Sequence, residues 1–300
     1  MRLLAVAAPR RPCPLCAGWR ARIIWREGSY DYLRCRRCRI VFSNLSAEEY
    51  ETTRHNMWDE ARPTEETIAF YGEARREAHR QFLEHCQPAG QGRMLDVGSG
   101  LGFFLERARR AGWDVTGCDT SPGWVAIARR RIEADRVVLG GVDAPELSGL
   151  RFDLVTAWDV VEHVFDPVPF LRRLADMMTS QGRLFLRTPN FAYVGPLYAL
   201  RQSLLRQSWA TLGPTNHVVY FTAATMARAL DAAGLRPVSW RIYPPPQVAV
   251  SADPRRRVRD NPAMSVKAKN LYGRTTSRLA VASSGRVVVG SDLDVLAVKR

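Results

Sequence analysis

An acidic side chain and three glycines lie together in one short stretch of the chain. Residues 94–102 read MLDVGSGLG, in which Asp96 ends an apolar run and Gly98 and Gly100 follow it. Glycine allows a sharp turn and a close approach of the backbone to a ligand, because it has no Cβ. A second acid, Asp119, ends the next apolar run, at a distance that suits a carboxylate accepting both hydroxyls of a ribose. The pattern predicts a nucleotide-binding turn.

A strand, a tight turn and a helix are the elements that would position these groups. Apolar residues recur at helical spacing after the turn, at Leu101, Phe104, Leu105, Ala108 and Ala111. The first turn of such a helix offers free backbone N–H groups to a ligand. The glycines have the spacing G-x-G-x-G, and Phe103 stands where the dinucleotide-binding fingerprint has its third glycine. An acid this close to the turn favours a ligand with a cationic end over a pyrophosphate.

At these residues the chain resembles the class I S-adenosylmethionine (SAM)-dependent methyltransferases. Residues 152–164 (FDLVTAWDVVEHV) resemble the fourth strand of that family and the turn after it, and residues 183–190 (RLFLRTPN) resemble the fifth strand. The resemblance covers residues 91–300 and is nearest to the ubiquinone-biosynthesis-like branch and to the sugar and secondary-metabolite branch. It implies an α/β, Rossmann-like fold with a mostly parallel seven-stranded sheet and helices on both faces.

The same resemblance implies a role for individual residues. Asp96 is expected at the amino group of the methionine part of SAM, and Asp119 at the ribose hydroxyls. The other cofactor-binding residues that it implies are Gly98, Ser99, Gly100, Thr120, Asp143, Ala144, Trp158 and Asp159. For Asp143, an ordinary surface acid in the loop after residues 136–139 is the alternative.

Two histidines are the candidates for a general base. Methyl transfer from a sulfonium is an in-line displacement, so alignment in a dry pocket supplies much of the rate. A hydroxyl or acidic-carbon acceptor also requires proton removal, and the resemblance places His163 and His217 at the pocket end. Alternatively, His163 and Glu162 order the turn after strand four, and His217 binds substrate or contacts a lid. The remaining histidines are expected on the surface: His55, His79 and His85.

Four cysteines near the N-terminus have the spacing of a zinc site. Cys13 and Cys16 form one C-x2-C pair, and Cys35 and Cys38 form another eighteen residues further on. Four thiolates around Zn²⁺ leave no open position, so the predicted metal is structural. The alternatives are disulfides or a redox pair, and a chain without a secretion signal disfavours disulfides. Two cysteines outside these pairs are expected to be small buried side chains: Cys86 and Cys118.

The chain divides into three parts by pattern. Residues 1–45 are predicted to form the zinc ribbon, with a hairpin between the two cysteine pairs. Residues 46–90 are predicted to be a helical connector that starts with a capping box at residues 46–49. Residues 91–300 are predicted to form the SAM-dependent methyltransferase domain. It carries two insertions that would build the acceptor pocket, at residues 191–215 and 244–285.

The net charge of +14 lies in two flanks of the chain. Residues 1–45 hold ten arginines against two acids, and residues 251–280 hold eight basic residues against two acids. Such flanks attract a phosphorylated or nucleotide-linked substrate, or RNA, although a solvated surface explains them equally well. No apolar run is long enough to span a bilayer, and the apolar start is too short for a signal peptide, so we expect a cytoplasmic protein.

Three functions are compatible with these observations. The first is a SAM-dependent methyltransferase acting on a small-molecule acceptor such as a sugar nucleotide, a glycan precursor or a secondary metabolite. The second is an RNA methyltransferase that binds RNA through the basic ribbon. The N/D-P-P-[YF] motif of many amino-methylating enzymes is missing, because residues 158–161 read WDVV. The third is a non-catalytic module that binds SAM or a protein partner. The sequence does not define the oligomeric state.

Overall fold

The computed structural model describes residues 9–27, 30–59, 62–88, 90–132, 134–196, 217–240 and 290–300, together with the isolated positions 275 and 283. Most of the two predicted insertions lies outside the described residues. Of the first insertion, residues 191–196 are described and are helical. Of the second, only positions 275 and 283 are described.

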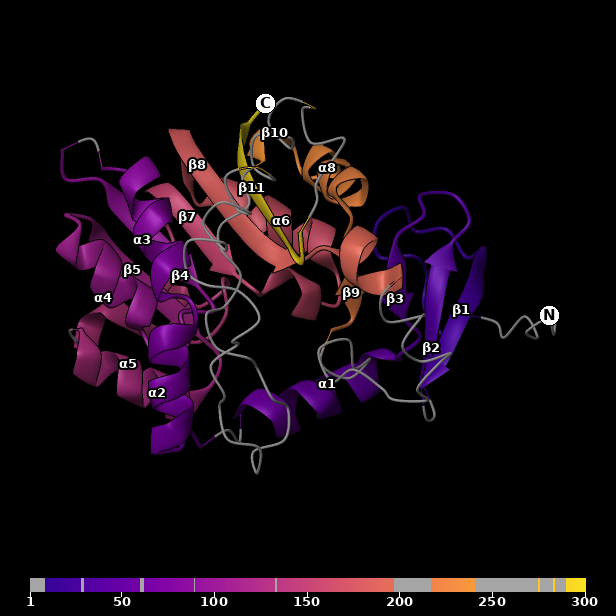
Figure 1. Ribbon diagram of the computed structural model, residues 1–300, viewed down its shortest axis with the longest axis horizontal. Coiled ribbons are helices and arrows are strands. Elements are labelled where there is room, and N and C mark those ends of the chain that lie inside the picture. Colours follow the sequence, from indigo (N-terminus) through magenta and orange to yellow (C-terminus); the bar gives the residue numbers. More distant parts are fainter. Residues whose placement is uncertain are drawn as a thin grey trace.

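A seven-stranded sheet forms the centre of the molecule, in the order β10-β11-β8-β7-β4-β5-β6 (Figure 1). The five strands from β8 to β6 in this order are parallel, whereas β11 runs antiparallel to both β8 and β10. The predicted mostly parallel seven-stranded sheet is therefore confirmed. The strands are β4 (Arg93–Val97), β5 (Asp114–Asp119), β6 (Val137–Leu139), β7 (Phe152–Trp158), β8 (Met178–Pro189), β10 (Leu235–Trp240) and β11 (Asp292–Lys299).

Helices cover both faces of this sheet, as predicted. Side chains alternate between the two faces of a strand, so Met94 and Leu95 on β4 enter different apolar clusters. The cluster of Met94 packs against α3 (Arg76–His85), α4 (Phe103–Arg110) and α5 (Pro122–Arg131). The cluster of Leu95 packs against α6 (Pro167–Asp176) and α8 (Ala223–Ala232). No helix among the described residues is long and apolar enough to cross a membrane.

The N-terminal hairpin belongs to a second sheet that also includes a strand from the C-terminal half. Its strands are β1 (Ala21–Glu27), β2 (Tyr30–Cys35), β3 (Val41–Ser43) and β9 (Val219–Tyr220), in that order. Strands β1 and β2 form the antiparallel hairpin that the sequence predicts. In the chain, β9 lies between β8 and β10 of the central sheet, and in space it lies beside β3 (Figure 1). The ribbon and the large domain therefore share backbone hydrogen bonds.

The connector between the two sheets is helical, as predicted. Helix α1 (Ala47–Arg54) begins with the predicted capping box between Ser46 and Glu49 and continues into η1 (His55–Asp59), a π-helical turn. Helix α2 (Glu65–Ala74) follows and is separated from α3 by one non-helical residue, Arg75. Three short 3₁₀ turns lie later in the chain: η2 (Ala134–Arg136), η3 (Pro145–Leu147) and η4 (Val161–His163).

A fully buried arginine joins the antiparallel edge to the rest of the sheet. Arg187 on β8 lies 3.1 Å from Asp292 (Nη2 to Oδ2) and 3.4 Å from Asp294 (Nε to Oδ1), both on β11. Burial alone lowers the pKa of a guanidinium, but the two carboxylates reverse the effect and hold the pKa of Arg187 above its usual value. The three side chains therefore form a buried ionic cluster.

Removal of one partner from this cluster is expected to be costly. Asp294→Ala leaves Arg187 with less compensation for its buried charge, and we expect a loss of about 3–5 kcal/mol in the free energy of unfolding. Urea-induced unfolding followed by circular dichroism measures it. The matched control is Glu84→Ala, which breaks an exposed pair with Arg80 and should cost about 1 kcal/mol or less. Equal losses of unfolding free energy in the two variants would contradict a stabilising role for the buried ionic cluster.

Candidate active site

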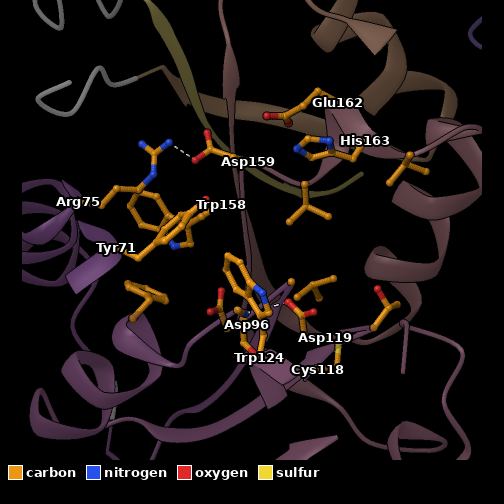
Figure 2. A pocket seen from close by; sticks show the side chains of 18 of the residues that line it. Tyr71, Arg75, Asp96, Cys118, Asp119, Trp124, Trp158, Asp159, Glu162 and His163 are labelled. Carbon is orange, nitrogen blue, oxygen red and sulfur yellow. Dashed lines mark hydrogen bonds and ion pairs between the residues drawn. The ribbon is translucent and has the colours of Figure 1, made fainter. Parts of the chain in front are cut away.

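A cavity of about 780 Å³ lies at the carboxyl ends of the parallel strands (Figure 2). Its volume falls within the range of about 300–1,000 Å³ that small-molecule sites occupy. The glycine turn and Asp119 line one part of it, and the η4 turn and His217 line another. Aromatic side chains complete the wall, among them Tyr71 from α2, Trp124 from α5 and Trp158 from β7.

The glycine turn requires its glycines. Gly98 has φ 69°, and a Cβ at this position would lie 2.5 Å from Cγ2 of Val160. Gly100 has φ 55° and packs under the ring of Trp124. The N–H groups of Gly98 and Ser99 both donate to the Cys118 carbonyl oxygen, at 2.9 and 3.0 Å. The turn is thereby bonded to the end of β5.

The carboxylate of Asp119 is held by the backbone on both of its oxygens. The N–H of Gly100 donates to Oδ2 and the N–H of Ser121 donates to Oδ1, each at 2.9 Å. Asp119 and Thr120 both line the cavity. A carboxylate fixed in this way can accept two hydroxyls from one side.

Asp96 is the most deeply buried acid of the turn, with 2% of its surface exposed. The hydroxyl of Thr156 donates to its Oδ1 at 2.7 Å. Burial raises the pKa of Asp96 to about 7, since the hydrogen bond from Thr156 offsets only part of the desolvation and the charge of Asp119 raises it further. Asp96 therefore changes its charge near neutral pH.

Asp159 pairs with a cation that the sequence analysis did not identify. It lies just beyond β7 with φ 54°, a value uncommon for a residue with a side chain, and its Oδ2 contacts Nη2 of Arg75 (Figure 2). Burial raises the pKa of Asp159, and the charges of Arg75 and Arg187 act against that shift. Arg75 reaches the cavity because α2 ends and α3 begins at this residue. Nothing in the local pattern indicated this contact.

His79 was expected on the surface, and that prediction is wrong. It is 5% exposed, and its ring lies 4.7 Å from Trp158 and 4.9 Å from Phe104, between centroids. Burial lowers the pKa of His79 well below its usual value, and the charge of Arg107 adds to the effect. Its neutral ring accepts a hydrogen bond from Arg107 Nη1 to Nδ1 at 2.8 Å. The sequence offered a signal, because His79 lies next to Ala78 and three residues before Phe82, both apolar and both buried on the same helix.

The two predicted base candidates lie side by side although they are distant in the sequence. The rings of His163 and His217 are 4.8 Å apart between centroids, and His217 Nε2 lies 3.9 Å from Oε1 of Glu162. All three residues line the cavity. Burial lowers the pKa of His217 well below its usual value, with a further effect from His163, and burial raises the pKa of Glu162 well above its usual value. At neutral pH, His217 is an uncharged imidazole.

Two of the expected cofactor-binding residues lie outside the cavity lining. The side chain of Asp143 is 86% exposed and lies 3.0 Å from Arg173 (Oδ1 to Nε). The neighbouring Gly141 and Val142 do line the cavity, whereas Asp143 and Ala144 do not. A role for Asp143 and Ala144 in cofactor binding stays a prediction.

The four predicted metal ligands converge on one point. Cys13 Sγ lies 3.4 Å from Cys38 Sγ, Cys16 Sγ lies 3.6 Å from Cys35 Sγ, and all four sulfurs lie within 4.8 Å of one another. Tetrahedral zinc with bonds of 2.3 Å separates its sulfurs by about 3.8 Å, and a disulfide by about 2.0 Å. The donor set therefore fits zinc. Cys86 and Cys118 are buried, as predicted.

The comparisons with known proteins agree with this geometry. A family model described as "Methyltransferase domain" matches residues 68–239. The chain is 35% identical over 153 residues to a protein of Azorhizobium caulinodans named ubiquinone biosynthesis O-methyltransferase, covering 47% of this chain and 58% of that one. It is 34% identical over 173 residues to a protein of the same name from Xanthomonas axonopodis pv. citri, covering 53% and 69%.

A solved structure supports the fold alone. A chain from a Haloferax volcanii complex of a methyltransferase with its activator superposes with a TM-score of 0.50 at 16% identity, covering 85% of this chain and 99% of that one. Because the family model matches more than half of the chain, and the sheet and glycine turn agree with it, the chain belongs to the methyltransferase domain family. Its sheet and glycine turn are those of the class I SAM-dependent methyltransferases, and the chain spans 58% of the length of the Azorhizobium caulinodans relative.

Proposed function

We propose that this enzyme transfers the methyl group of SAM to an oxygen atom of a small-molecule acceptor. The observation that carries the proposal is that one cavity joins the glycine turn and Asp119 to the pair of His163 and His217. A methyl donor bound at the glycine turn and Asp119 would face an acceptor bound at the two histidines. Both relatives are named ubiquinone biosynthesis O-methyltransferase, and this supports oxygen as the acceptor atom.

The cofactor half of the cavity fits SAM by its chemistry. Asp119 presents a fixed carboxylate to the ribose hydroxyls, and Asp96 supplies a negative charge for the methionine ammonium. Gly98 and Gly100 let the backbone approach the ligand closely, and Thr120 and Trp158 line the same region. SAM supplies an activated methyl group on a cationic sulfur. The aromatic wall around Tyr71 and Trp124, whose rings lie 5.1 Å apart, favours such a cation.

The acceptor half would move one proton. A neutral His217 can accept the proton of the acceptor hydroxyl while the hydroxyl oxygen attacks the methyl carbon. Glu162, buried beside Nε2 of His217, would then interact with the imidazolium that forms. His163 packs on the ring of His217 and restricts its orientation. Alignment of oxygen, methyl carbon and sulfur supplies the remaining rate.

Small hydroxylated compounds are the acceptor class that we propose, including sugar nucleotides, glycan precursors and secondary metabolites. A cavity of about 780 Å³ with aromatic walls suits such molecules. The exposed arginines of the ribbon would assist a phosphorylated or nucleotide-linked acceptor. RNA as the acceptor and binding of SAM without turnover are the outcomes that the assays must separate from this one.

We also propose that Cys13, Cys16, Cys35 and Cys38 bind one structural Zn²⁺. Their mutual distances support it, and so does the burial of Cys13, Cys35 and Cys38, since unpaired thiolates are costly to bury. The metal would hold a segment that is too small to fold around its own core.

The purified protein is expected to contain about one zinc per chain, as a closed four-thiolate site requires. Plasma mass spectrometry on protein purified without added metal measures the zinc content. Cys86→Ser is the matched control, because Cys86 is buried but belongs to neither pair, and it should retain the metal. A wild-type protein that is stable without metal would contradict the zinc assignment.

SAM affinity is expected to increase as pH rises from 6 to 8. Below its pKa of about 7, Asp96 is protonated and offers no charge to the methionine ammonium, so the Kd should fall by up to tenfold per pH unit until Asp96 ionises. Isothermal titration calorimetry at several pH values measures the slope. Asp96→Asn should bind weakly with little pH dependence, whereas Asp176→Asn, at an exposed position, should behave as wild type. The same slope in Asp96→Asn as in wild type would assign the titration to another group.

His217→Gln is expected to lower kcat about 10²–10⁴-fold without weakening SAM binding, because only proton removal is lost. Labelled methyl transfer from SAM to a panel of hydroxylated small molecules, with total RNA as a parallel substrate, measures turnover. His85→Gln, at an exposed position on α3, is the control. Label found only in RNA would overturn the small-molecule proposal. Binding of SAM without any labelled product would favour the non-catalytic alternative.

A further inference from the structure

We propose that the four-cysteine ribbon, residues 9–45, positions the acceptor half of the cavity, so that metal occupancy controls the placement of His163 and His217 but not the binding of SAM. The proposal rests on the proposed function for the roles of the two halves. The contacts that carry it are independent of the identity of the acceptor.

The ribbon is bonded directly to the segment that carries His217. Strand β3 pairs with β9, which begins two residues after His217. Ser43 at the end of β3 is fully buried, its N–H donates to the Val218 carbonyl oxygen at 3.0 Å, and its hydroxyl donates to the His217 carbonyl oxygen at 3.2 Å. The backbone on which His217 stands is therefore held by the last strand of the ribbon.

The ribbon also reaches the turn that carries His163. Arg11 is 4% exposed, its guanidinium lies 3.3 Å from the ring centroid of Phe165, and it donates to the Phe165 carbonyl oxygen. From the other side, Tyr50 on α1 packs 5.0 Å from the Phe165 ring and donates its hydroxyl to the His163 carbonyl oxygen at 3.0 Å. The residues after His163 are thus clamped between the ribbon and α1.

The two histidine segments are joined to each other as well. The N–H of Val218 donates to the Glu162 carbonyl oxygen at 2.8 Å. A displacement of β3 would therefore pass through Val218 to the turn of Glu162 and His163. The ring contact between His163 and His217 depends on both segments.

The cysteine pairs hold the parts of the ribbon that make these contacts. Cys13 lies two residues after Arg11, Cys35 ends β2, and Cys38 lies in the bend between β2 and β3. The N–H of Cys35 donates to the Ile40 carbonyl oxygen at 3.0 Å, and Arg228 on α8 donates to the Cys38 carbonyl oxygen at 3.1 Å. Strand β3 has only three residues, so the bend before it determines where it lies. Loss of the metal would release this bend and Arg11 together.

The cofactor half has a different support. The hydrogen bonds on Asp96, Gly98 and Asp119 described above come from β5, β7 and the glycine turn. One face of these strands packs against α3, α4 and α5, on the side of the molecule away from the ribbon (Figure 1). Release of the ribbon should therefore alter the acceptor half and leave the cofactor half unchanged.

Histidine NMR on the full chain tests the proposal without any acceptor. The chain has five histidines, so the ring signals of His163 and His217 can be assigned from His163→Gln and His217→Gln. We expect chelation of zinc to shift or broaden these two signals, while the Kd for SAM changes less than threefold. Loss of SAM binding together with the metal would show that the metal stabilises the whole fold. Unchanged histidine signals would show that the ribbon is an independent appendage. Either result overturns the proposal.

A metal-loaded variant removes the risk that chelation unfolds the ribbon. Arg11→Met keeps the apolar stem but loses the hydrogen bond to Phe165, and it should shift the His163 and His217 signals with zinc content and SAM affinity retained. Arg20→Met makes the same change at an exposed ribbon position and should leave the signals as in wild type. Wild-type signals in Arg11→Met would contradict the proposal. Failure of wild-type protein to bind SAM would instead contradict the proposed function.

Discussion

The parallel register of β4 with β5 and β7 is the constraint on which the rest of the cavity depends. It pairs Asp96 with Gly117 on one side and with Thr156 on the other, so the carboxyl ends of the three strands meet at one edge. The glycine turn can then bond to Cys118, and Thr156 can donate to Asp96. A shift of one residue would turn Asp96 toward the opposite face and remove the acid from the turn.

Local sequence pattern was enough to predict the parallel strands, the glycine turn and the cysteine cluster. Short-range features carried the signal: the apolar runs, the glycines, Asp119, and the two cysteine pairs. Contacts between distant segments were not predicted, because neither partner shows a local pattern. Strand β9 has two residues and pairs with the ribbon, and Arg75 reaches Asp159 only because α2 ends there. The surface prediction for His79 failed because its polarity was weighed above its place beside Ala78 and Phe82 on one face of a helix.

Several buried charges among the described residues form linked pairs that cross between elements. Arg187 holds β11 against β8 through Asp292 and Asp294, and its charge also acts on Asp159 at the edge of the cavity. Asp159 in turn contacts Arg75 from the helical connector. Each carboxylate needs its cation, since an isolated buried charge is far more costly than a paired one. The helices that precede the domain are thereby tied to the sheet at the cavity itself.

The two halves of the cavity differ in what would have to change to accommodate another acceptor. The cofactor half is built from consecutive strands and turns, so an alteration there disturbs the sheet that supports it. The acceptor half is assembled from η4, β9, α1 and the ribbon, which meet through a few hydrogen bonds at Ser43, Tyr50 and Arg11. Substitutions at such contacts can move His163 and His217 without altering the strands beneath. Under the proposed function, the fold would thus permit acceptor choice to change while methyl-donor binding is retained.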